Sequence, residues 1–85
     1  FPGLRLAYEA GKKGGSMPTV YNAANEYAVS EFLNRRIAYL EIAEMIEKAM
    51  ENHRTIENPT VEEILKTEQE TYELLKMQHA GKMIG

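Results

Sequence analysis

The sequence predicts an all-α fold, a small four-helix bundle. Three observations support this prediction: apolar residues recur at helical spacing in four separate segments, the links between the segments are short, and no strand pattern of any length appears. At 85 residues, 44% of them hydrophobic, the chain is long enough for one small core. We therefore expect residues 1–85 to form a single helical domain with little margin of stability.

The first predicted helix follows Pro2, because proline fits a first helical turn. One side of this helix carries Leu4, Ala7, Tyr8 and Gly11, and Leu6 and Ala10 flank it. The run KKGGS then ends the helix at Gly14-Gly15-Ser16. A phosphate-binding loop is the alternative interpretation of this run. It lacks the P-loop pattern and a preceding strand, so we interpret the glycines as a helix terminator.

The central helix is predicted over Thr19–Ile37, the longest uninterrupted helical segment, with Pro18 just before it. Its apolar residues are Val20, Ala24, Tyr27, Ala28 and Phe32 on one broad side, and Val29 and Leu33 on the other. A helix that is apolar on most faces is usually buried among other helices. This segment should therefore lie at the centre of the bundle.

The first two turns of the central helix carry a polar cluster, Asn22, Asn25 and Glu26. Asn22 and Glu26 are one turn apart and can touch. One interpretation makes the cluster a ligand or metal site, although one carboxylate and two amides suit a divalent metal poorly. The other makes it a buried hydrogen-bond network that fixes helix packing or docks the domain on another one, and the residues favour this second interpretation.

A third helix is predicted from about Leu40 to Asn52. Its apolar stripe consists of Ile42, Met45, Ile46, Ala49 and Met50. After a loop, Thr60-Val61-Glu62-Glu63 has the spacing of a capping box, and Thr67-Glu68-Gln69-Glu70 repeats it. Two start signals leave two alternatives, one kinked helix or a short helix that leads into a longer one. We favour a break near Thr67.

Composition and charge exclude several classes of function. Residues 1–40 carry five cations and three glutamates, a balance of +2, whereas residues 41–73 carry ten glutamates and three cations, a balance of −7. The acidic half argues against nucleic acid and anionic membranes as partners. There is no cysteine and no HExxH spacing, so His53 and His79 are interpreted as helix-end or half-buried residues and not as metal ligands. No signal peptide or apolar run of membrane-spanning length is evident, which favours the cytoplasm.

Three segments resemble the C-terminal domain of 1-deoxy-D-xylulose 5-phosphate reductoisomerase, in order and at matching spacing. FPGLRLAYEA is similar to that family's FPCLRLA, NAANE followed by YAVSEFLNRRI resembles its central helix, and ENPTVEEIL is similar to its NPTLEDIL. Each motif is weak alone, but together they cover nearly all of the chain. The resemblance implies a C-terminal fragment of a larger enzyme. The start at Phe1 instead of Met also leads us to expect sequence upstream.

The resemblance also implies the activity of the whole enzyme. That enzyme converts 1-deoxy-D-xylulose 5-phosphate to 2-C-methyl-D-erythritol 4-phosphate with NADPH and Mg²⁺ or Mn²⁺, in the non-mevalonate route to isoprenoids, as a homodimer. Its substrate, metal and nicotinamide sites belong to upstream domains, and no GxGxxG loop occurs here. We expect this fragment alone to be inactive, to contain no catalytic, cofactor or metal residue, and to support the upstream catalytic domain, its partner.

Two positions depart from the family pattern. Gly3 stands where the family usually has Cys, and Leu40 stands where Thr, Ser or Asp often caps the third helix. We expect both to lower the stability of the isolated domain.

A stand-alone helical module that docks a partner helix is the alternative function. Such a module should be monodisperse, whereas a domain cut from an enzyme should expose the patch that its missing domains cover. An independent enzyme is a third option, which the lack of a recognisable nucleophile–base pair or metal cluster disfavours.

Overall fold

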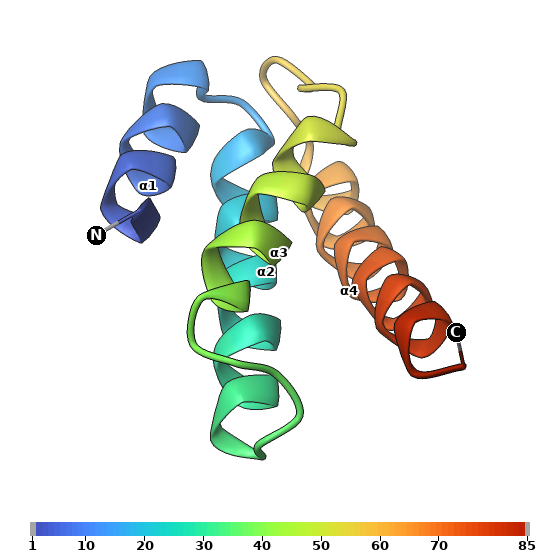
Figure 1. The fold of residues 1–85 in the computed structure, drawn as a ribbon. Coiled ribbons are helices and arrows are strands. Elements are labelled where there is room, and N and C mark those ends of the chain that lie inside the picture. Colours follow the sequence, from blue (N-terminus) through green and yellow to red (C-terminus); the bar gives the residue numbers. More distant parts are fainter. Residues whose placement is uncertain (1, 85) are drawn as a thin grey trace.

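The computed structural model describes the backbone of residues 2–84 and the side chains of residues 3–78. Over these residues the chain forms four helices: α1 (Pro2–Lys13), α2 (Met17–Leu33), α3 (Glu41–Glu51) and α4 (Val61–Ile84). Helix α2 contacts the other three, whereas α1 and α4 lie on opposite sides of it and do not touch each other (Figure 1). The predicted all-α fold with four helices is confirmed.

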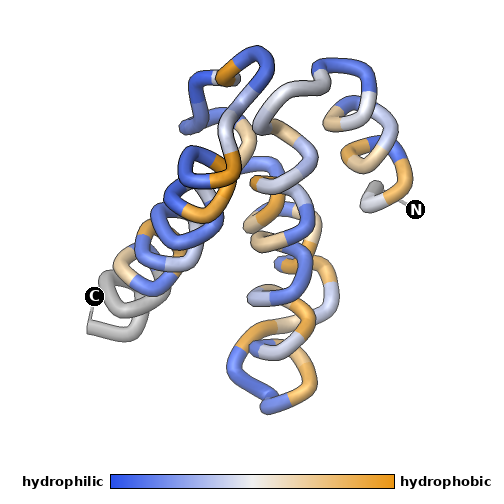
Figure 2. The backbone as a smooth tube through the Cα atoms, turned by 180° about the vertical axis from the view of Figure 1, so that it is seen from behind, coloured by the Kyte–Doolittle hydropathy of each residue, from blue (hydrophilic) through white to orange (hydrophobic). Residues whose placement is uncertain are grey.

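One hydrophobic core joins the four helices around α2. Its buried members are Leu6 and Ala10 of α1, Met17, Val20, Ala24 and Ala28 of α2, Ile42, Ile46, Ala49 and Met50 of α3, and Leu75 of α4. The alanines on α2 let neighbouring helices approach closely, which suits its central place. Seen from behind, the turns of α4 carry both hydrophilic and hydrophobic residues (Figure 2).

Helix α1 turns a different side to the core than the main apolar stripe indicated. Leu6 and Ala10 are buried, whereas Leu4 and Tyr8 are 72% and 64% exposed. The helix is short and apolar on two sides, so spacing alone could not decide which side packs against α2 and α3. The stripe with Leu4 and Tyr8 therefore lies on the outside of the bundle.

The turn between α1 and α2 confirms the helix-terminator interpretation. Gly14 and Gly15 have φ angles of 67° and 54°, values that favour glycine. The amide of Gly14 donates to the Ala10 carbonyl at 3.0 Å, which closes the last turn of α1. Ser16 then stands at the N-cap of α2.

Helix α2 ends at Leu33, four residues before the predicted end at Ile37. The C-cap is Asn34, whose backbone amide and side-chain amide both donate to the Ser30 carbonyl, at 3.0 and 2.8 Å. Arg35 follows with a φ of 60°, which takes the chain out of the helix. Apolar spacing continued through Ile37, but the amide of Asn34 offers the backbone an alternative to a further turn.

Helix α3 matches its prediction. Ile42, Ile46, Ala49 and Met50 are buried, so the predicted stripe faces the core. Leu40 stands at the N-cap and makes no side-chain capping hydrogen bond, as its departure from the family pattern suggested. The Glu41 carboxylate accepts a hydrogen bond from the amide of Ala38 at 2.9 Å instead, so another side chain satisfies a donor ahead of the helix.

The expected break near Thr67 is wrong, because α4 runs through this residue. Thr60 and Glu63 form the first capping box: the Thr60 amide donates to the Glu63 carboxylate at 2.9 Å, and the Glu63 amide donates to the Thr60 hydroxyl at 3.1 Å. Thr67 is 2% exposed and lies inside the helix, and the Thr71 hydroxyl donates to its carbonyl at 2.8 Å. The second predicted capping box, Thr67-Glu68-Gln69-Glu70, does not start a helix, because Thr67 is packed into the bundle within α4 and caps no helix end.

Candidate functional site

The predicted polar cluster lies on the side of α2 that its three neighbours leave partly uncovered. Asn22 and Glu26 are exposed and Asn25 is half-buried, so the expected burial of the cluster is wrong. The structure thus places all three residues on one stretch of α2, at a surface of the described chain. Whether they fix packing or dock another domain is not decided by this placement and stays a prediction.

Helix α4 adds two residues that extend this cluster. The Tyr72 hydroxyl lies close to the Glu26 carboxylate, with Glu68 one turn before Tyr72 on α4. Partial burial raises the pKa of Tyr72, and the negative charges of Glu26 and Glu68 raise it further. Tyr72 therefore stays a neutral hydroxyl donor between two carboxylates that belong to different helices.

Large apolar side chains are also exposed on these two helices, α2 and α4. Val61 and Leu65 at the start of α4 are 72% and 59% exposed, and Leu33 at the end of α2 is 71% exposed. Exposed apolar side chains next to hydrogen-bonding groups are typical of protein contact surfaces. We call Asn22, Asn25, Glu26, Glu68 and Tyr72, with Leu33, Val61 and Leu65, the α2–α4 surface.

A second polar cluster ties the α1–α2 turn to the loop between α3 and α4. The Ser16 hydroxyl oxygen accepts the amide proton of Ile56 at 2.8 Å and lies 2.6 Å from Nε2 of His53. The Ser16 amide donates to the Ile56 carbonyl at 3.0 Å. Ser16 is 0% exposed, so these bonds are made inside the protein. We call this group of contacts the loop lock.

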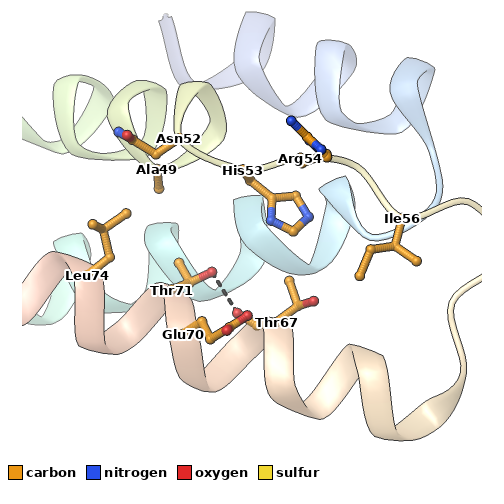
Figure 3. A pocket seen from close by; sticks show the side chains of 9 residues that line it. All are labelled: Ala49, Asn52, His53, Arg54, Ile56, Thr67, Glu70, Thr71 and Leu74. Carbon is orange, nitrogen blue, oxygen red and sulfur yellow. Dashed lines mark hydrogen bonds between the residues drawn. The ribbon is translucent and has the colours of Figure 1, made fainter.

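A hollow of about 460 Å³ opens between the end of α3, this loop and α4 (Figure 3). It is lined by Ala49, Asn52, His53, Arg54, Ile56, Thr67, Glu70, Thr71 and Leu74. Ser16 and His53 have the residue types of a nucleophile and a base, but Ser16 is fully buried and is not among the lining residues. A substrate in the hollow therefore could not reach its hydroxyl, and the pair serves to hold the two loops together.

Burial sets the charge state of the half-buried His53. Desolvation lowers the pKa of its imidazole, and the negative charge of Glu70 partly offsets this effect. At neutral pH the ring is therefore neutral, so one of its nitrogens can accept the Ser16 hydroxyl proton. The His53 interpretation as a half-buried residue is confirmed, whereas the side chain of His79 lies outside the described residues.

Glu31 on α2 is the most buried carboxylate of the described chain, at 8% exposure. Arg36 pairs with it at 3.3 Å. Burial raises the pKa of Tyr27, and the charge of Glu31 one turn later on the helix raises it further. These groups hold the end of α2, since a buried carboxylate needs hydrogen-bonding partners.

The described side chains do not assemble a metal cluster. No group of three or more His, Cys, Asp or Glu among them could hold a metal ion. Among the helices described, none combines the length and hydropathy that a membrane span requires.

Sequence reasoning found Asn22, Asn25 and Glu26 but missed Tyr72 and the Ser16–His53 pair. The position of Tyr72 opposite Glu26 depends on how α2 and α4 pack, which local spacing does not give. Ser16 and His53 are 37 residues apart, so no local spacing relates them. The one available signal was a serine shortly before the predicted central helix, a residue type whose hydroxyl commonly bonds backbone amides.

Comparisons with known proteins give one family. Residues 1–74 match the DXP reductoisomerase C-terminal domain. The 1-deoxy-D-xylulose 5-phosphate reductoisomerase of Lachnoclostridium phytofermentans is 60% identical over 75 residues, which are 88% of this chain and 19% of that protein. The enzyme of the same name from Listeria innocua is 53% identical over 76 residues, 89% of this chain and 20% of that protein. No solved structure gives a significant match.

The matches cover only a small part of each relative. The chain spans about a fifth of the length of the curated relatives it matches. A third relative, from Geobacillus kaustophilus, is 64% identical over 61 residues, 72% of this chain and 16% of that protein. Most of each relative therefore lies outside the matched part.

Proposed function

The chain belongs to the DXP reductoisomerase C-terminal domain family, and from this we propose that it is the helical C-terminal domain of a 1-deoxy-D-xylulose 5-phosphate reductoisomerase. The match over residues 1–74 carries the proposal. In it, residues 1–85 form one domain of a larger enzyme, which converts 1-deoxy-D-xylulose 5-phosphate to 2-C-methyl-D-erythritol 4-phosphate with NADPH in the cytoplasm.

The role of this domain is structural. Its partners are the upstream domains of the same chain, and through them the second subunit of a homodimer. The domain packs against the catalytic domain and holds its active-site walls in shape. Neither NADPH nor a divalent cation enters its own role, because the described residues offer no cluster that suits a metal. The fragment alone is inactive in this proposal.

The α2–α4 surface is the part that contacts the upstream domains. It combines amide and carboxylate groups of Asn22 and Glu26 with the exposed apolar side chains of Val61 and Leu65. Burying exposed apolar area drives association, while the polar groups fix the geometry of the contact. On α1, Arg5 is already paired with Glu9 and Glu47, and Lys12 lies over the ring of Tyr8 in the outward stripe.

Complementation tests the proposal. The upstream part of the Lachnoclostridium phytofermentans relative is produced without its last domain and mixed with this chain, and NADPH oxidation is followed with substrate and Mg²⁺. Activity that appears only on mixing supports the structural role. Activity of the upstream part alone, unchanged by the chain, would contradict it. No NADPH oxidation in any mixture, with binding shown by an independent assay, would also contradict it and would favour a stand-alone interaction module.

A pair of matched variants tests the surface. Glu26→Lys should weaken binding to the upstream part, because it reverses a charge inside the proposed contact. Glu44→Lys makes the same change on the exposed side of α3, away from the surface, and should bind like the unmodified chain. Equal affinities of the two variants would place the contact elsewhere.

A further inference from the structure

We propose that His53 is an acid-sensitive latch, which as a neutral ring closes the loop lock through Ser16 and as a charged ring turns toward Glu70 on α4 and opens the lock. This inference goes beyond the proposed function and does not depend on it. It rests on the hydrogen bonds of one buried hydroxyl, that of Ser16, and on the Glu70 carboxylate that lines the same hollow as His53.

The Ser16 hydroxyl is fully used when the ring is neutral. A hydroxyl has one proton to donate and two lone pairs that can accept. One lone pair accepts the amide proton of Ile56 at 2.8 Å. Nε2 of His53 lies 2.6 Å from the hydroxyl oxygen, and in the proposed latch the hydroxyl proton goes to Nε2, which requires the neutral ring to carry its own proton on Nδ1.

Protonation reverses one of these bonds. Nε2 of the charged ring carries a proton and must donate, so the Ser16 hydroxyl can no longer donate to it. The hydroxyl proton then needs another acceptor, although Ser16 is 0% exposed and has no water at its surface to turn to. An unpaired buried polar group is unfavourable, so the contact between the charged ring and Ser16 is weaker than the neutral one.

The hollow offers the charged ring a better partner. His53 and Glu70 line the same hollow, and the Glu70 charge favours the charged ring. Of the other lining residues, only Arg54 on the loop is charged, and it opposes a second positive charge. The groups that α3 and the start of α2 contribute here, Asn52 and Ser16, are uncharged. The volume of about 460 Å³ leaves room for the imidazole to turn about its side-chain bonds.

The consequence reaches three elements of the fold. When the ring leaves Ser16, the hydroxyl loses its contact with Nε2 and its bond to the Ile56 amide weakens, while the Ser16 amide still donates to the Ile56 carbonyl at 3.0 Å. When the charged ring turns, it forms an ion pair with Glu70 of α4, a helix that contacts α3 through few residues. The latch therefore exchanges a link between α2 and the loop for a link between the loop and α4.

Heteronuclear NMR of the 85-residue chain tests the latch. The pH is lowered from about 8 to about 5, a range that titrates histidine. Ring nitrogen shifts report the tautomer, hydrogen exchange reports the protection factor of the Ile56 amide, and His53→Gln separates the signals of His53 from those of His79. We expect the Nδ1–H tautomer at high pH. The Ile56 protection factor should fall roughly five- to tenfold as His53 titrates.

Two variants separate the latch from a general loss of structure. Glu70→Gln should lower the pKa of His53 and move the loss of Ile56 protection to lower pH by the same amount. Glu73→Gln removes an equal charge from the same helix but outside the hollow, and should shift neither. An Nε2–H tautomer at high pH, Ile56 protection that does not follow the titration, or equal shifts in both variants would each overturn the latch.

Ser16→Ala gives a further readout where it folds. Removing the hydroxyl should lower Ile56 protection at high pH by the same roughly five- to tenfold and make it independent of the His53 titration. If Ser16→Ala does not fold, the tautomer of the unmodified chain and the Glu70→Gln comparison still decide the question.

Discussion

Gly15→Ala is the substitution that should destabilise the α1–α2 turn most. Gly15 has a φ of 54°, and a Cβ built there would overlap the carbonyl oxygen of Ile56 and lie 3.1 Å from the Thr55 methyl group. The obstacle is backbone and not a flexible side chain, so the two loops must move apart. That movement breaks the hydrogen bond of 3.0 Å from the Ser16 amide to the Ile56 carbonyl.

The magnitude follows from two contributions. A non-glycine residue in the left-handed region is disfavoured by about 1–2 kcal/mol. Leaving the buried amide and carbonyl of Ser16 and Ile56 without partners adds about 1–3 kcal/mol. The free energy of unfolding should therefore fall by about 2–5 kcal/mol, a large part of the roughly 5–15 kcal/mol that holds a typical domain together.

Gly14→Ala is the matched control. Gly14 has a similar φ of 67°, but a Cβ there meets nothing within 4 Å. Only the backbone contribution of about 1–2 kcal/mol should appear. Urea unfolding of both variants, followed by far-ultraviolet circular dichroism, gives the two free energies. Equal losses in the two variants would refute the close packing of Gly15 against Ile56.

Further substitutions and one change of pH test other parts of the fold. Gly11→Ala should raise stability by about 0.5–1 kcal/mol in the same urea assay, because Gly11 is exposed in mid-helix and a Cβ there meets nothing within 4 Å; a loss would mean that the site is crowded. Thr60→Ala should lower stability by about 1 kcal/mol through loss of the cap on the Glu63 amide, and Thr60→Ser should restore most of it. Leu75→Ala should remove about 2–5 kcal/mol, because this leucine of α4 is 0% exposed, and a smaller effect would show that α4 is loosely docked. Burial lowers the pKa of His53 in the folded chain below its ordinary value of 6.5. Between the folded and unfolded pKa values the unfolded chain binds more protons than the folded chain, so the stability that the neutral ring contributes is complete above pH 6.5 and is lost as the pH falls through the folded pKa. His53→Gln should make the urea midpoint less dependent on pH over this range, and an unchanged dependence would contradict the assignment to His53.

Sequence signals predicted the helices well where the signal depends only on residues a few positions apart. Helical spacing and the capping box of Thr60 and Glu63 predicted α3 and the start of α4, and the glycine pair predicted the end of α1. These signals are local because a helix is closed by hydrogen bonds four residues apart. The early end of α2 was missed because the Asn34 amide competes with the backbone, which apolar spacing does not register.

The sequence by itself determined the all-α class, the four helices and, through motifs that cover nearly the whole chain, the family. It also singled out Asn22, Asn25 and Glu26 as polar groups on a mostly apolar helix. Only the tertiary structure decided which side of α1 is buried, that Thr67 lies within a continuous α4, and that Tyr72 stands opposite Glu26. It also decided that Ser16 meets His53 across 37 residues. The physical reason is the same in each case: these features depend on which helix faces pack together, and that choice is made by burying apolar area over the whole chain.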